Sequence, residues 1–171
     1  MNQSSLQQFD ELVDAAVRDQ PRARRLLAEQ PDLLEARGRF GETPLHFLAV
    51  ESFVEGVRFL AEAGAKVNAS NEGGETPLLS AALLGNYEVA AVLLTHGADP
   101  NASSNTVDNV LHAAVGSGNG QLVGLLLRSG ADPHYRTELG ETVFDALPSD
   151  GPKREEVLRA LAEHGVIEGA V

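Results

Sequence analysis

A five-residue string that returns every 33 residues constrains this chain more than any other feature of its sequence. Gly-Glu-Thr-Pro-Leu stands at 41–45 and again at 74–78, and related strings occupy 107–111 and 140–144. A fixed period of this length indicates one supersecondary unit copied in tandem, with each copy burying its apolar side against the next. The sequence therefore predicts a stacked array of similar units.

Each copy carries the signals for two helices separated by a short break. Thr43 and Thr76 are good N-caps because their hydroxyls accept hydrogen bonds from the first turn, and the proline that follows each one suits the first helical position. Apolar residues then recur at helical spacing, and a glycine such as Gly64 or Gly97 closes the second helix. The linkers between helix pairs are too short for a further element, so tight turns projecting to one side are expected.

These signals divide the chain into about five units within a single domain, 1–171. We expect an N-terminal cap repeat at 6–35, full repeats at 36–68, 69–101 and 102–134, and a C-terminal cap repeat at 135–165.

The two terminal units depart from the pattern. The first lacks the Thr-Pro opener; we expect its helices at 6–19 and about 22–30, ended by Gln20-Pro21 and by Pro31. In the last unit Phe144 and Leu147 are expected to pack from a first helix, and two extra residues fall in a loop over 148–153.

Composition narrows the class of protein. An apolar fraction of 43% in 171 residues excludes general disorder, and no apolar run approaches the roughly 20 residues that span a bilayer. Asp10, Glu11 and Asp14 stand where a secretory signal would need apolar residues. With no cysteine in the chain, a cytoplasmic location is the expectation.

The net charge of −12 is unevenly distributed. Residues 40–171 hold 7 Lys and Arg against 18 Asp and Glu, so they carry −11 of it. An acidic body repels nucleic acid and anionic membranes. We expect neither as a partner and favour a basic protein, although acidity can also serve solubility alone.

Several strings resemble the ankyrin repeat. They are Thr43-Pro44-Leu45-His46, Thr76-Pro77-Leu78, Leu111-His112-Ala113-Ala114, Gly85-Asn86, Gly118-Asn119, 93–101 and 126–133. The resemblance implies an all-α solenoid of about five stacked helix–turn–helix units, joined by hairpin-like turns. It also implies protein binding on a concave face formed by these turns and the first helices.

The third copy of the opener departs from the family pattern. Val107, Asn109 and Val110 replace Gly, Thr and Pro, so the loop 103–107 is expected to take a different turn, because valine resists the positive φ that glycine allows.

No constellation of residues indicates catalysis, a metal or a cofactor. His46 and His112 occupy the repeat position where the resemblance implies hydrogen bonds joining neighbouring turns, and His96 and His164 precede closing glycines. His134 is the odd one out, but it has no zinc-type partner spacing. The glycine-rich 116–120 lacks the Lys-Ser/Thr of a phosphate loop. An enzyme or small-ligand binder is kept as a remote alternative.

Four carboxylates recur just before the helix openers and form what we call the acidic column: Glu42, Glu75, Asp108 and Glu141. Neighbours in a stack lie about 10 Å apart, too far to share a proton or a metal. Two compatible roles are open: electrostatic stabilisation of helix N-termini, or recognition of Lys and Arg side chains on a partner.

Apolar side chains are also expected at exposed positions. The resemblance implies that two kinds of position vary with the partner: the tips of the hairpin-like turns, just before each opener glycine, and the two residues after the inward-facing alanines of each first helix. The candidates at these positions are Phe40, Leu139, Leu83 and Leu84, with Glu51 beside them. Several apolar residues on one surface suggest a binding patch, and Phe40 is a plausible aromatic anchor. Alternatively, Leu83 and Leu84 pack against the adjacent repeat.

The sequence as a whole predicts an adaptor, or an inhibitor or immunity-type protein, that docks one protein partner rigidly on its concave face. A monomer is expected. The alternative from another class is a structural repeat protein that self-associates through the same patch in a symmetric contact.

Overall fold

The computed structural model describes residues 3–105 and 109–167, and in that part of the chain it contains α-helices, one 3-10 helix and no strand. The elements are α1 (Gln3–Arg18), α2 (Gln20–Glu29), η1 (Pro31–Glu35), α3 (Pro44–Val50), α4 (Val54–Glu62), α5 (Pro77–Leu83), α6 (Tyr87–Thr95), α7 (Val110–Ser117), α8 (Gly120–Arg128) and α9 (Pro152–Glu163).

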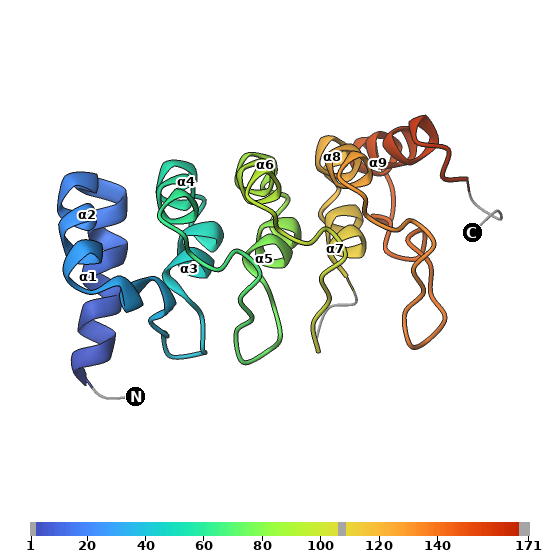
Figure 1. Ribbon diagram of the computed structural model, residues 1–171. Helices are drawn as coiled ribbons and strands as arrows, with labels where there is room; N and C mark the ends of the chain where they lie inside the picture. The colour runs from blue at the N-terminus through green and yellow to red at the C-terminus, as the bar shows by residue number, and fades with distance from the viewer. Residues whose placement is uncertain (1–2, 106–108, 168–171) are drawn as a thin grey trace.

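The helices form a stack that runs from the N-terminus to the C-terminus (Figure 1). The inner helices α3, α5 and α7 form one row, and the outer helices α4, α6 and α8 form a second row, above it in Figure 1. The loops between helix pairs project to one side, from the row of inner helices (Figure 1). This agrees with the prediction that turns without a further helix or strand join the units. The expected all-α stack of helix–turn–helix units is confirmed.

The helix openers work as predicted. The Thr43 and Thr76 hydroxyls accept hydrogen bonds from the amides of His46 and Leu79, and each proline lies in the first helical turn. Asn109 caps α7 in the same way through its side-chain oxygen. The third unit of this type therefore begins its inner helix normally despite its changed opener.

The core follows the 33-residue period along the whole stack. Equivalent leucines are buried in successive inner helices (Leu45, Leu78, Leu111) and in successive outer helices (Leu60, Leu93, Leu126). Each repeat thus buries its apolar side against both neighbours, which stabilises all units together.

The break between the first two helices falls earlier than expected. Pro21 does not end the first helix; it lies in the first turn of α2, where its missing N–H costs nothing. Asp19 caps α2 by accepting from the Arg22 amide at 3.0 Å. The predicted end of the second helix before Pro31 is confirmed, and the 3-10 helix η1 begins at Pro31.

The expected first helix of the last unit is wrong, because residues 143–146 form turns instead, but Phe144 and Leu147 pack against the core as predicted. The Asp145 carboxylate accepts from the Thr142 amide at 2.7 Å and from its hydroxyl at 2.9 Å, and these bonds lower the pKa of Asp145. The Asp145 amide then closes a short turn onto the Thr142 carbonyl. Pro148 disfavours helical geometry at Leu147, so the segment cannot extend into a helix.

Candidate functional site

The loops that project from the inner side are closed turns, here called fingers: 38–42, 71–75 and 137–141. The first residue of each donates its amide to the carbonyl of the last, at 2.7, 3.0 and 3.1 Å. Neighbouring fingers are also joined, since the Glu72 amide donates to the Phe40 carbonyl and the Asn105 amide to the Gly73 carbonyl. The first two fingers and the loop at Asn105 are therefore linked in a row.

The loop for which a different turn was predicted belongs to this row. Its residue Asn105 makes the same inter-finger bond as Glu72 does. Residues 106–108 lie outside the described part of the chain, so the predicted change of turn there stays a prediction.

The acidic column has a local role that the sequence did not reveal. Glu42 accepts from the Phe40 amide at 2.7 Å, Glu75 from the Asn71 side-chain amide at 3.3 Å, and Glu141 from the Thr137 hydroxyl at 3.5 Å. Each of these carboxylates thus bonds within its own finger. Asp108, the remaining member, lies outside the described residues.

Glu42 illustrates how closely such a carboxylate is tied to its turn. Its side chain folds over Gly38 and occupies the space that a Cβ at that position would need. Glu42 therefore shapes the first finger, and this role comes in addition to any contact it makes with a partner.

A second set of candidates lies at the C-terminal ends of the inner helices. Leu83 is the last residue of α5 and Leu84 is its C-cap; they are 42% and 57% exposed. Val50, the equivalent of Leu83 in α3, is 47% exposed. Glu51, the C-cap of α3 and the equivalent of Leu84, is exposed as well. Leu83 and Leu84 thus remain accessible rather than being covered by the adjacent repeat.

The apolar fingertips lie apart from this set. Phe40 and Leu139 are 73% and 85% exposed, each on its own finger. They stand three repeat spacings apart along the stack, roughly 30 Å at 10 Å per helix pair. The structure therefore provides one group of apolar side chains at the helix ends and two isolated apolar fingertips.

The sequence placed Val50 in the variable pair after the inward alanines, but Val50 was not among the predicted site residues, and Phe47 was not predicted at all. Phe47 is partly exposed on α3, and its ring lies edge-on to Phe9 of α1 at 6.1 Å. Aligning the repeats would have found Phe47, because the equivalent positions hold the small residues Ser80 and Ala113, which are buried.

His46 links the helix opener to the next finger, as the resemblance implied. Its Nδ1 accepts from the Thr43 amide at 3.2 Å, and its Nε2 lies 2.9 Å from the Glu75 carbonyl. Because a carbonyl only accepts, Nε2 carries the proton and the ring is neutral. Burial lowers the pKa of His46, which favours this neutral form.

His112 joins neighbouring units in a different way. Its Nδ1 bonds to the Asn109 side-chain oxygen at 2.9 Å, within its own helix opener. Its ring lies edge-on to Tyr135 of the following unit, with centroids 5.6 Å apart.

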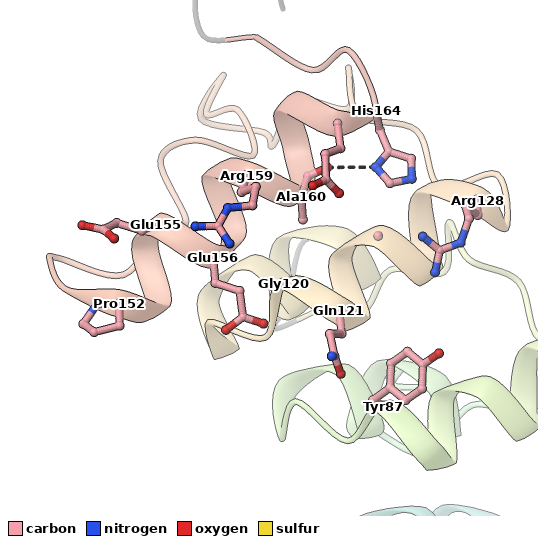
Figure 2. Close-up of a pocket in the computed structure, with 12 residues that line it drawn as sticks. Tyr87, Gly120, Gln121, Arg128, Pro152, Glu155, Glu156, Arg159, Ala160 and His164 are labelled. Atoms are coloured by element: carbon pink, nitrogen blue, oxygen red, sulfur yellow. Dashed lines mark hydrogen bonds between the residues drawn. The ribbon is translucent and has the colours of Figure 1, made fainter.

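A hollow of about 740 Å³ lies on the outer side, between α9, α8 and Tyr87 of α6 (Figure 2). Gly120 and Gly124 of α8 line it, together with Arg159 and Glu156 of α9. The His164 ring turns back to bond the Ala160 carbonyl at 2.8 Å. Mixed charges on an open surface give this hollow no evident chemistry.

Two further searches concern the described residues alone. Within 3–105 and 109–167, no helix is both long and apolar enough to cross a membrane. The same residues contain no group of three or more His, Cys, Asp and Glu side chains that could hold a metal ion.

Comparison with known proteins adds the family. A model of ankyrin repeats (3 copies) matches residues 12–104, more than half of the chain, and a model of a single ankyrin repeat matches residues 108–138. None of the curated proteins matches the chain. Ankyrin repeats are generally protein–protein interaction modules and typically non-enzymatic binding scaffolds. The three-copy match, the 33-residue period and the stacked helix pairs agree, and the chain belongs to the ankyrin repeat family.

Proposed function

We propose that this chain is a non-catalytic binding protein that docks a basic protein on its inner-helix face. This face comprises the fingers and the exposed residues of α3, α5 and α7. The observation that carries the proposal is the group of apolar side chains exposed at the inner helix ends, namely Val50, Leu83 and Leu84. Grouped exposed apolar residues in a binding scaffold are typical of interaction sites.

The charge distribution supports a basic partner. Residues 40–171 carry almost all of the net charge of −12, and Glu51, Glu72 and Glu138 are exposed on α3 and the fingers. Complementary charge steers encounter and orients the complex, while buried apolar contacts supply most of the affinity.

The fingers support docking without rearrangement. A closing bond holds each finger, and further bonds join the first two fingers and Asn105, so these turns are in place before a partner arrives, which lowers the ordering cost of binding. Rigid docking of this kind suits an adaptor, and equally an inhibitor or immunity-type protein that blocks a basic enzyme.

The proposal includes the site residues, the domain division and the location. We assign partner contact to Phe40, Glu42, Glu51, Glu75, Leu83, Leu84, Asp108, Leu139 and Glu141. We take 1–171 as one domain with cap repeats at 6–35 and 135–165, acting in the cytoplasm as a monomer.

Comparative affinity purification tests the proposal. The wild type, a Leu83→Ser/Leu84→Ser variant and an Ile167→Ser control are immobilised, and proteins retained from the native lysate are quantified. Ile167 is an exposed apolar residue outside the inner-helix face. A basic protein held by the wild type and the control but lost from the double variant supports the proposal. Equal retention by all three contradicts it, provided that circular dichroism shows the variants folded.

Self-association through the same leucines is the outcome that would replace this proposal. Light scattering over a range of concentrations separates the two. A dimer that forms in the wild type and dissociates in the Leu83→Ser/Leu84→Ser variant would assign the leucines to a symmetric contact instead.

A further inference from the structure

We propose that the partner segment seated on the helix-end residues Val50, Leu83 and Leu84 is an amphipathic α-helix with basic flanks, lying along the stack. This inference rests on the proposed function and specifies its partner.

The apolar contacts on this face repeat with the stack. Val50 and Leu83 are equivalent residues at the ends of α3 and α5, which pack directly against each other. Packed helices lie about 8–10 Å apart, so the two side chains offer apolar contacts at about that spacing. Leu84 widens the second contact, since it lies beside Leu83 and is 57% exposed.

A helix matches this spacing better than an extended strand. Seven residues of an α-helix advance about 10.5 Å and return to the same face after two turns. An extended strand covers about 10 Å in three residues, and an odd step points the second side chain to the opposite face. A helix lying along the stack can therefore place apolar residues seven positions apart on Val50 and Leu83.

Charged residues on the same face determine which residues are favoured on either side of the partner helix's apolar stripe. Glu51 is exposed beside Val50, at the position that Leu84 takes in the next repeat. Glu72 is exposed on the finger that leads into α5. The Glu51 carboxylate at the end of α3 and the Glu72 carboxylate on the finger before α5 favour lysine or arginine on the two edges of the docked helix.

The test uses two peptide display libraries of equal length and equal lysine content. One places apolar residues seven positions apart on a helical stripe, and the other alternates apolar and polar residues as a strand does. Both are selected on the wild type, on the Leu83→Ser/Leu84→Ser variant and on the Ile167→Ser control.

We expect enrichment from the helical library on the wild type and on the control, with binding weakened about tenfold or more by the double variant. The selected peptides should gain helical circular dichroism on binding. The substitution Glu51→Lys should also weaken binding of the selected peptides, whereas Glu62→Lys on the outer helix α4 should leave their binding unchanged.

Two other outcomes overturn the inference and differ in what they mean for the proposed function. Leucine-dependent enrichment from the alternating library would keep the binding face and replace the helix with an extended segment. No leucine-dependent enrichment from either library would count against both the helical partner and the proposed face.

Discussion

At the scale of single residues, Ser52 stands out because its backbone adopts a conformation that glycine prefers. Its φ is +62°, and it is the one non-glycine residue with a positive φ in the part of the chain that the structure describes. The equivalent residues are Gly85 and Gly118, at φ +65° and +78°. The Ser52 hydroxyl accepts from the Asn86 side chain, whereas Asn119 donates to the Gly85 carbonyl.

Replacing Ser52 by glycine should therefore raise stability. Ser52→Gly removes backbone strain of about 1 kcal/mol, and Asn86 can turn to the carbonyl as Asn119 does. Ser52→Ala is the matched control, since it keeps the strain and loses the hydroxyl. The free energy of unfolding in urea should be highest for Ser52→Gly, intermediate for the wild type and lowest for Ser52→Ala. Equal unfolding free energies for Ser52→Ala and Ser52→Gly would show that the backbone is not strained.

A second prediction at this scale concerns pH. Burial lowers the pKa of His46 in the folded chain, so the unfolded chain binds its proton more readily. Stability from the neutral ring is present above the unfolded pKa of 6.5 and is lost as pH falls from there toward the folded pKa. Urea unfolding at a series of pH values measures this loss.

The matched variant for the pH prediction is His46→Gln, which cannot titrate. Its unfolding free energy should fall less than that of the wild type on acidification below pH 6.5. Parallel pH profiles for the two proteins would mean that His46 does not contribute.

At the scale of elements, the packing of α9 on α8 distinguishes the last unit. Figure 1 shows α8 end-on, while α9 runs across the picture. At Gly120, a Cβ would come within 2.6 Å of the Glu156 carbonyl oxygen, so the backbones of the two helices approach closely there. In this last unit, turns at 143–146 take the place of an inner helix before α9.

Two glycines on α8 provide a matched pair for this packing. Gly120→Ala should destabilise the chain by about 1–3 kcal/mol, since the carbonyl it meets belongs to the backbone. At Gly124 a Cβ would meet the end of the Arg128 side chain at 3.2 Å, which can move. Gly124→Ala should therefore stabilise by up to about 1 kcal/mol through helix propensity.

Thermal unfolding of both variants measures the difference. A similar effect of the two substitutions would contradict the close approach of α8 and α9 at Gly120.

The helical elements show what the sequence could predict. The Thr-Pro openers, the closing glycines and the 33-residue period are local and repeated, so they located the helix pairs and their core leucines. The turns at 143–146 were missed because Asp145 and Pro148 act together to prevent a helix that the period alone predicts.

The candidate site was less predictable for a related reason. The exposure of Leu83, Leu84 and Val50 depends on how far the neighbouring repeat covers each helix end, and the hydrogen bonds of Glu42 and Glu141 depend on finger geometry. Residue type and position in the repeat identified these candidates. That Phe40 and Leu139 lie apart from Leu83 and Leu84 is visible only in the stacked structure.

At the scale of the whole molecule, charge and apolar surface have separate roles in the proposed complex. The −11 carried by residues 40–171 should speed encounter with a basic partner, and salt screens this attraction. The association rate should therefore fall as salt rises, while the dissociation rate changes little. Stopped-flow or surface kinetics at several salt concentrations test this; a salt-independent association rate would contradict it.

The central claim is that the apolar side chains at the inner helix ends hold the partner. The most direct test is the dissociation constant of the purified partner, measured for the wild type and the Leu83→Ser/Leu84→Ser variant with Ile167→Ser as the control. We expect the double variant to bind at least about tenfold more weakly and the control to keep the wild-type dissociation constant. A folded double variant that binds as tightly as the wild type would contradict it.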